Sequence, residues 1–342
     1  MAHLVSGPRM YFVLAIIFVA PIVLAYAAFV RWLDRYEPEP LWALSAAFVW
    51  GGTGAIAGSV VVTVVADAVL QAASGVGAAG LEATSATLVA PLVEESWKGL
   101  GVVGLFVVGH LILRELDGPL DGVIYGGMIG LGFTLTEDVL YVGQAGSTEG
   151  AAGFAALVVV RTILGGLGHC LYTSLTGLGF GAATRARSRA VQLLLPVAGF
   201  GAAVLLHTVH NGLATAAGPL GVLVAIPLTW IEVAAWLALV AVLVLGDREV
   251  VRRQLRGELG GLVRDEAELA RLCTVVTRSV RLLAVWRKEG FGAYRRARRR
   301  DHALVELALV KERIARGSAS RRLERAERAR RDELSGLGAA GT

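Results

Sequence analysis

The sequence predicts an all-α membrane protein, a polytopic bundle of about seven to eight transmembrane helices with a helical cytoplasmic C-terminal extension. The 342-residue chain is 55% hydrophobic and 18% charged, with a mean hydropathy of +0.62, well above that of soluble domains. Its apolar residues come in runs of about twenty or more, the length that crosses a hydrocarbon core of about 30 Å. The residues from 247 onward are strongly basic instead.

Candidate spans follow one another along the first part of the chain, at residues 10–33, 41–70, 82–113, 119–142, 152–184, 190–215 and 218–246. The first run leads directly into further spans and has no small-residue cleavage site before polar sequence, so we expect it to be retained. The third and fifth runs are long enough to tilt or break. Glycines are frequent in the fourth and fifth runs, which favours close helix packing there.

Basic loops orient the bundle. They follow the first, third and fifth spans and contain Arg31, Arg35, Arg114, Arg185, Arg187 and Arg189. The alternate loops, near 71–81, 143–151 and 215–219, contain no Lys or Arg. Because short basic loops favour the cytoplasm, we expect the N-terminus outside and the C-terminal tail inside.

Charge also divides the chain into two expected parts, a transmembrane bundle at 1–246 and a basic, helical cytoplasmic tail at 247–342. The tail holds 24 of the 33 Lys and Arg residues and 14 of the 28 acids. A basic tail of this kind is expected to bind anionic lipid head groups. We do not expect a nucleic-acid partner, because the run YRRARRRDH lacks interleaved aromatic residues or a known binding pattern.

Ionisable residues inside the third span point to function. Glu94, Glu95 and Lys98 lie in PLVEESWKG, between two apolar stretches, and a charge in a membrane span is costly enough to indicate a functional site. Glu94 and Lys98 are spaced i, i+4 on one helix face, so an ion pair would account for Glu94. It would leave Glu95 without a local partner, and we expect function from at least one of the two glutamates.

Other polar residues occur on the next three spans. Glu137 lies on the fourth, one turn after Phe133; His169 lies on the fifth, one turn before Thr173; His207 and Asn211 share a face of the sixth. Asp67, Asp138 and Arg161 lie near span ends and are expected to reach interfacial water. Carboxylates with imidazoles are what water activation requires: a glutamate takes the proton, a histidine or metal polarises the carbonyl, and an N–H donor stabilises the oxyanion.

These residues occur in motifs that resemble the PrsW family of intramembrane proteases. The motifs are EESWK (94–98), FTLTE (133–137), HCLYTSLTG (169–177) and HTVHN (207–211), in that order, and DRYEPEP (34–40) is also typical of the family. The resemblance covers residues 10–246. It implies a metal-dependent endopeptidase of the bacterial plasma membrane that cuts a membrane-anchored protein, such as an anti-sigma factor.

The resemblance also implies roles for these residues. Glu94 or Glu95 would be the general base, Asn211 would donate to the oxyanion, and His169 and His207, with Glu137, would hold a zinc ion or polarise the scissile carbonyl. Lys98, Phe133 and Thr173 would support them. Asp138 departs from the Asn associated with this position of the family, and CAAX endopeptidases carry His where Glu137 stands, which disfavours prenyl-CAAX processing.

A proton-coupled transporter or channel is the alternative function. Buried Glu, His and Lys residues also build proton relays, and Glu232 on the seventh span fits such a relay. The spans are unequal in length and show no inverted repeat, which argues against a common transporter architecture.

Overall fold

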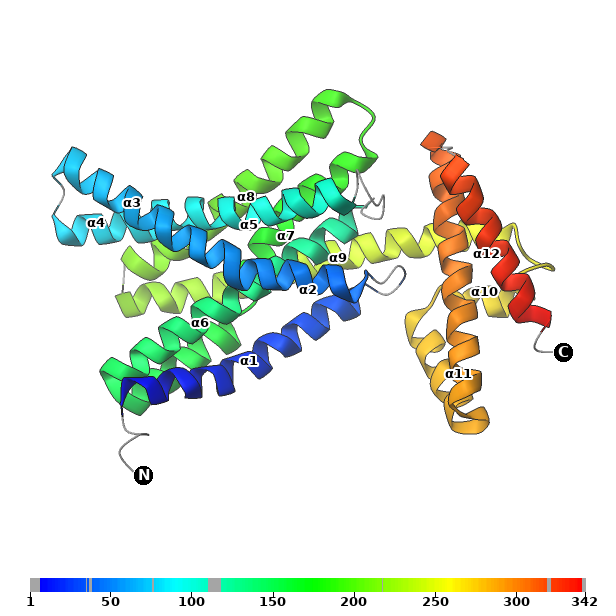
Figure 1. Cartoon of the computed structure of the whole chain (residues 1–342), viewed down its shortest axis with the longest axis horizontal. Helices are drawn as coiled ribbons and strands as arrows, with labels where there is room; N and C mark the ends of the chain where they lie inside the picture. The colour runs from blue at the N-terminus through cyan, green and yellow to red at the C-terminus, as the bar shows by residue number, and fades with distance from the viewer. Residues whose placement is uncertain are drawn as a thin grey trace. The chain divides into compact units, whose positions relative to one another are not determined.

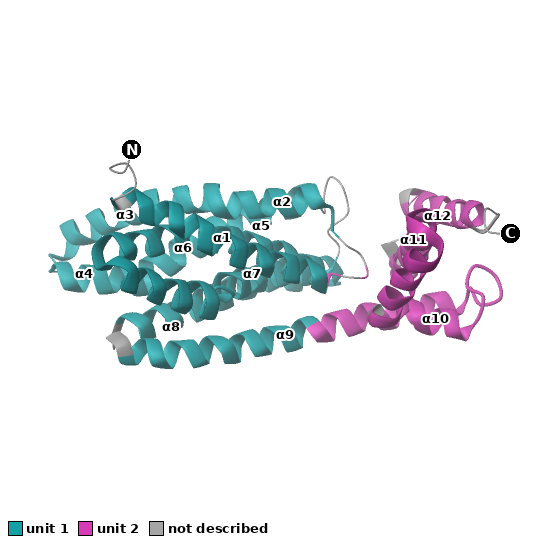
Figure 2. Ribbon diagram, turned by 90° about the horizontal axis from the view of Figure 1, so that it is seen from below, with its two compact units in different colours: residues 1–33, 39–240 teal, residues 34–38, 241–342 magenta. Residues whose placement is uncertain are grey.

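The structure is a computed structural model that describes residues 7–34, 36, 39–75, 77–109, 118–216, 218–318 and 321–339. Within these residues every regular element is a helix and no β-strand occurs (Figure 1). The helices form two compact units, residues 1–33 with 39–240 (unit 1) and residues 34–38 with 241–342 (unit 2) (Figure 2). The predicted all-α polytopic bundle is confirmed.

Unit 1 is the helical bundle. Its elements are α1 (Pro8–Leu33), α2 (Leu41–Trp50), η2 (Gly51–Ala55), α3 (Ile56–Ser74), α4 (Ala78–Thr84), η3 (Ser85–Val89), α5 (Ala90–Phe106), α6 (Pro119–Leu157), η5 (Val158–Leu164), α7 (Gly168–Arg185), α8 (Arg189–Ala216) and α9 (Gly218–Arg256), whose last part belongs to unit 2. The elements named η are π-helical turns, which join α2 to α3, α4 to α5 and α6 to the turn before α7. Such turns inside long helices are frequent at functional sites.

The described residues contain five helical segments long and apolar enough to cross a membrane, Arg9–Leu33, Leu41–Ser74, Pro119–Arg185, Arg189–Thr215 and Leu220–Arg256. The 67-residue segment Pro119–Arg185 contains the predicted fourth and fifth spans together. The predicted third span is not among the five, because α5 carries Glu94, Glu95 and Lys98. Its last residues, and the loop arginines Arg35 and Arg114, lie outside the described residues.

Helix α6 is the centre of the bundle, and glycine lets its neighbours approach it closely. A Cβ at Gly122 would lie 2.0 Å from the carbonyl oxygen of Gly177 on α7, and one at Gly130 would lie 2.2 Å from that of His169. On the opposite side, a Cβ at Gly132 would lie 1.9 Å from the carbonyl oxygen of Phe48 on α2. Only glycine allows these backbone contacts, so α6 holds α2 and α7 at fixed positions beside the polar residues.

The predicted fifth span is broken in two. Gly150, with φ 70° and ψ −157°, ends the straight part of α6, and a short turn at residues 165–167 precedes α7. Between the breaks lies a short helical segment, residues 151–164, that ends in the π-helical turn η5. His169 therefore lies in the first turn of α7 and not in the middle of a continuous span.

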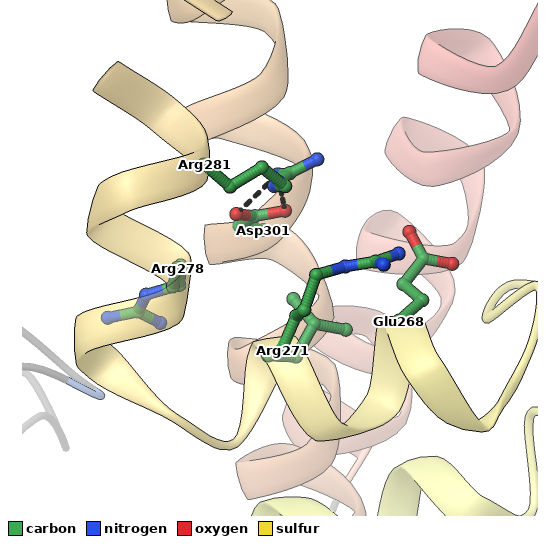
Figure 3. Close-up of a pocket in the computed structure, with 6 residues that line it drawn as sticks. Glu268, Arg271, Arg278, Arg281 and Asp301 are labelled. Carbon is green, nitrogen blue, oxygen red and sulfur yellow. Dashed lines mark hydrogen bonds and ion pairs between the residues drawn. The ribbon is translucent and has the colours of Figure 1, made fainter. Parts of the chain in front are cut away.

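Unit 2 consists of α10 (Glu266–Leu272), α11 (Val275–Arg313), η6 (Ile314–Ser318) and α12 (Arg321–Ala339), with the end of α9. Gly290, with φ 83°, breaks α11 into two arms. Arg281 on the first arm bonds both carboxylate oxygens of Asp301 on the second, each at 2.6 Å (Figure 3). Arg331 of α12 bonds both oxygens of Glu258 at 2.8 and 2.9 Å, so ion pairs join elements distant in sequence.

Candidate active site

Helix α5 places two acids and one cation inside the bundle. Lys98 and Glu95 are fully buried, and Glu94 is 12% exposed at its side chain. The Lys98 ammonium lies 2.7 Å from Glu95 Oε1 and 3.5 Å from Glu94 Oε2. The sequence spacing predicts a pair between Glu94 and Lys98, but the shorter contact is to Glu95. Positions i, i+3 and i, i+4 are both neighbours on a helix, and the lysine points toward the more deeply buried acid.

Glu95 accepts from groups on three helices. Besides Lys98, it accepts a hydrogen bond from the Thr173 hydroxyl of α7 at 3.2 Å and lies 3.1 Å from Nδ1 of His207 on α8. A carboxylate can only accept at that contact, so Nδ1 of His207 carries the hydrogen. Its Nε2 lies 3.8 Å from Glu94 Oε2. Glu95 thus orients His207 toward Glu94.

His169 has a partner at each ring nitrogen. Nε2 lies 2.7 Å from Glu137 Oε2 on α6, and Nδ1 lies 3.0 Å from the Lys98 ammonium. An ammonium only donates and a carboxylate only accepts, so His169 is protonated on Nε2 and its Nδ1 lone pair faces Lys98. The Phe133 ring lies 5.0 Å from the His169 ring and 4.0 Å from the Lys98 nitrogen, which covers this side of the cluster.

The predicted residues therefore converge, with one partial exception. Glu94, Glu95, Lys98, Phe133, Glu137, His169, Thr173 and His207 are joined by the contacts above. Asn211 instead donates its side-chain amide to the carbonyl oxygen of Ala86, in η3, at 3.0 Å. That bond ties α8 to the kink before α5, and the predicted oxyanion role of Asn211 stays a prediction.

Sequence reasoning missed two residues of the cluster. Asp138 is 2% exposed, so its side chain does not reach water as expected, and the Arg161 guanidinium bonds both Glu137 at 2.7 Å and Asp138 at 3.1 Å. The signal available in the sequence was the charge balance: two adjacent acids on one span and one arginine on the next.

Three side chains in this cluster form a candidate metal-binding group. One ligand atom each from Glu94, His169 and His207 lie within 4.8 Å of one another. Two imidazoles and one carboxylate are a known zinc donor set that leaves a coordination position open for water. The other nitrogens of both imidazoles meet carboxylates, Glu95 and Glu137, as those of metal-binding histidines usually do. The donor types therefore fit zinc. The Lys98 ammonium contacts Glu94 and lies 3.0 Å from Nδ1 of His169, so it would have to leave that nitrogen for a metal ion to bind there.

Comparison with known proteins agrees with the motifs. The profile of the family described as "PrsW family intramembrane metalloprotease" matches residues 39–245. "Protease PrsW" of Geobacillus kaustophilus (strain HTA426) is 33% identical over 150 residues, which are 44% of this chain and 58% of that protein. This chain thus matches somewhat more than half of its relative's length. No solved structure matches the chain. Because the family profile matches more than half of the sequence, the chain belongs to the PrsW family of intramembrane proteases.

Proposed function

We propose that this protein is an intramembrane endopeptidase that hydrolyses a peptide bond of a membrane-anchored protein. The observation that carries the proposal is the convergence of Glu94, His169 and His207, from three helices of an apolar bundle, to within 4.8 Å. Family membership supports the reaction class. It also favours a regulatory substrate such as an anti-sigma factor, because that is the role the motifs imply.

Glu94 is the general base in this proposal. Its side chain is 12% exposed, and its polar partners Lys98 and His207 lie 3.5 and 3.8 Å away. Because neither contact is short, the carboxylate can accept a proton from water. Glu95 is fully buried and accepts from three groups, which suits an orienting role. The water oxygen attacks the scissile carbonyl carbon, Glu94 takes the water proton and then gives it to the departing amine. One hydrogen of the Asn211 side-chain amide binds the Ala86 carbonyl oxygen, and the second would donate to the oxyanion.

We propose that Glu94, His169 and His207 are also the residues that hold a zinc ion. When bound, zinc would polarise the scissile carbonyl and lower the pKa of the attacking water. Glu95 and Glu137 fix the two ring orientations that such binding requires. A carboxylate bound to zinc is a weaker base, so the ligand role and the base role of Glu94 are alternatives. Zinc content of the purified protein, with His169→Gln and His207→Gln as comparisons, tests the assignment.

The activity is tested by comparing membrane-protein termini in cells that express the wild type or Glu94→Gln. Glu149→Gln is the matched control, because Glu149 is an exposed acid at the far end of α6. We expect one or a few new termini that depend on Glu94 and appear equally with the control. Identical termini with the wild type and Glu94→Gln would refute the proposed function.

The remaining proposals concern placement. We propose that residues 1–246 are the catalytic bundle, that the N-terminus lies outside a bacterial plasma membrane, and that residues 247–342 are a cytoplasmic tail. Basic loop residues Arg185, Arg187 and Arg189 support this orientation. Protease protection of a C-terminal tag in inverted and right-side-out vesicles tests it: the tag should be cut only in inverted vesicles.

We also propose that the tail binds anionic lipid head groups through the break in α11. The first arm of α11 leaves apolar side chains exposed, Val276, Val280, Leu283 and Trp286, and Phe291 follows the break at 62% exposure. Basic residues Arg287 and Lys288 stand beside it, a combination typical of membrane surfaces. An environment-sensitive dye at Phe291→Cys should shift to the blue in nanodiscs with anionic lipid, and a dye at Arg328→Cys should not. Equal spectra would contradict the proposal.

A further inference from the structure

Arg161 lies on a short helical segment that has a break at each end and a hydrogen bond to α1. The short helical stretch 151–164 is separated from α6 by Gly150, with φ 70°, and from α7 by the turn at 165–167. The Tyr26 hydroxyl of α1 donates to the carbonyl oxygen of Ile163 at 2.8 Å. The π-helical turn Val158–Leu164 therefore has an anchor next to Arg161, and it presents the guanidinium to α6.

The guanidinium is held from several directions. Nη2 donates to Glu137 Oε2 at 2.7 Å, and Nε donates to Asp138 Oδ1 at 3.1 Å. The Tyr141 ring lies 4.1 Å from the guanidinium carbon. The second Asp138 oxygen accepts from the Thr162 hydroxyl at 2.9 Å. Asp138 is thus anchored by the segment that carries Arg161. Because the planar Arg161 guanidinium donates to two carboxylates at once, it has little freedom to rotate.

One oxygen connects this clamp to the candidate active site. Glu137 Oε2 accepts both from Arg161 Nη2 and from His169 Nε2, each at 2.7 Å. Arg161 fixes where that oxygen lies, and the oxygen, together with the Lys98 ammonium at Nδ1, determines which nitrogen of His169 carries the hydrogen. The Nδ1 lone pair then faces Lys98.

We infer that Arg161 is a positioning residue for His169: through Glu137 it helps to hold the imidazole in the Nε2-protonated tautomer, with the Nδ1 lone pair facing Lys98. Its role in catalysis rests on the proposed function, but its effect on the His169 tautomer does not. Asp138 serves this role by anchoring the far side of the guanidinium, which also gives a physical reason for an acid at this position. Carboxylate partners of active-site histidines usually contribute about 10- to 100-fold in activity or metal affinity.

The test compares two variants of the full-length protein in lipid. Asp138→Asn keeps the bond from Arg161 to Glu137 and restores the residue associated with the family. Arg161→Gln combined with Asp138→Asn removes one positive and one negative charge together, so it leaves Glu137 without its clamp but adds no net charge. The His169 tautomer is read by solid-state ¹⁵N NMR of histidine-labelled protein, with His169→Gln to assign the signals.

We expect one Nε2-protonated tautomer in the wild type, a small mixed fraction in Asp138→Asn because the guanidinium loses one charged partner, and a much larger mixed fraction in the double variant. Cleavage of the Glu94-dependent substrates should fall about 10- to 100-fold in the double variant relative to Asp138→Asn. The same decrease should not appear when Glu137 is already Gln, because Arg161 acts through Glu137. An unchanged tautomer in the double variant would overturn the inference, and so would additive losses with Glu137→Gln.

If the double variant does not fold, Arg161→Lys decides. A lysine keeps the charge but cannot bond both acids as a fork does, so we expect a partly mixed tautomer and an intermediate rate; wild-type values for both would overturn the inference. Loss of the proposed function would look different. The wild type would then produce no Glu94-dependent termini, while the tautomer would still depend on Arg161.

Discussion

Adjacent glutamates on α5 should have separable effects on stability and on chemistry. The perturbation is Glu95→Gln compared with Glu94→Gln, each of which removes one charge and keeps the shape. Distance alone does not distinguish them, because Coulomb energy scales as 1/r and contacts of 2.7 and 3.5 Å to Lys98 differ only about 1.3-fold. Burial distinguishes the two glutamates, because the Glu95 side chain is fully buried and the Glu94 side chain is 12% exposed.

The expected magnitudes follow from that difference. Glu95→Gln leaves the fully buried Lys98 ammonium without its nearest counter-charge, and breaking a buried ion pair costs about 3–5 kcal/mol. Glu94→Gln breaks a longer contact and leaves Lys98 its nearest counter-charge, Glu95, so it should cost clearly less than Glu95→Gln. A general base contributes about 10²- to 10⁴-fold to rate, so Glu94→Gln should lose cleavage by that factor and remain folded.

The assay pairs thermal unfolding in detergent with the yield of Glu94-dependent termini. Glu95→Gln should unfold at a clearly lower temperature than Glu94→Gln, and Glu95→Gln with Lys98→Met should recover most of that loss, because removal of both charges of a buried pair is often near neutral. Equal unfolding temperatures of the single variants would refute this assignment of roles. So would full cleavage by Glu94→Gln.

Further predictions concern packing and pH. Gly130→Ala should reduce the cleavage rate about 10²-fold, because its Cβ would lie 2.2 Å from the carbonyl oxygen of His169 and would displace that histidine. Gly104→Ala is the control, because a Cβ there would have nothing within 4 Å. Equal cleavage rates of the two variants would contradict the packing argument. In unit 2, the hydrogen bond from Arg331 lowers the pKa of Glu258 from its ordinary 4.5. The stabilisation is therefore present above pH 4.5 and is lost as the pH falls through the lowered value. Hydrogen exchange of α12 should accelerate over that range in the wild type, and Glu258→Gln should exchange faster at neutral pH with a smaller change on acidification; an unchanged pH response in Glu258→Gln would contradict it.

The sequence was sufficient for the class of fold and for most of the cluster. Apolar runs predict the helices because the bilayer demands about twenty apolar residues for each span. Costly polar residues stand out against that background, which is why Glu94, Glu95, Glu137, His169 and His207 could be named without a structure. The contacts show that these residues converge.

Rotamers and helix breaks were not predictable in the same way. Glu94 and Glu95 are both neighbours of Lys98 on the helix, so the preference of Lys98 for Glu95 depends on what α7 and α8 place beside each acid. Arg161 reaches Glu137 only because Gly150 adopts a positive φ and reverses the chain. The break inside the predicted fifth span is the turn at residues 165–167. Hydropathy averages over this turn, so the sequence indicated only that the run is long enough to tilt or break.

The most direct test of the central claim is hydrolysis by the purified protein. Wild type and Glu94→Gln are reconstituted in nanodiscs with a substrate identified from the Glu94-dependent termini, in water enriched in ¹⁸O. The new carboxyl terminus of the product is read by mass spectrometry, and proton flux is followed in matched liposomes. We predict one ¹⁸O atom in that terminus with the wild type, no product with Glu94→Gln, and no Glu94-dependent flux. Uncut substrate with the wild type, together with proton flux that requires Glu94, would contradict the account.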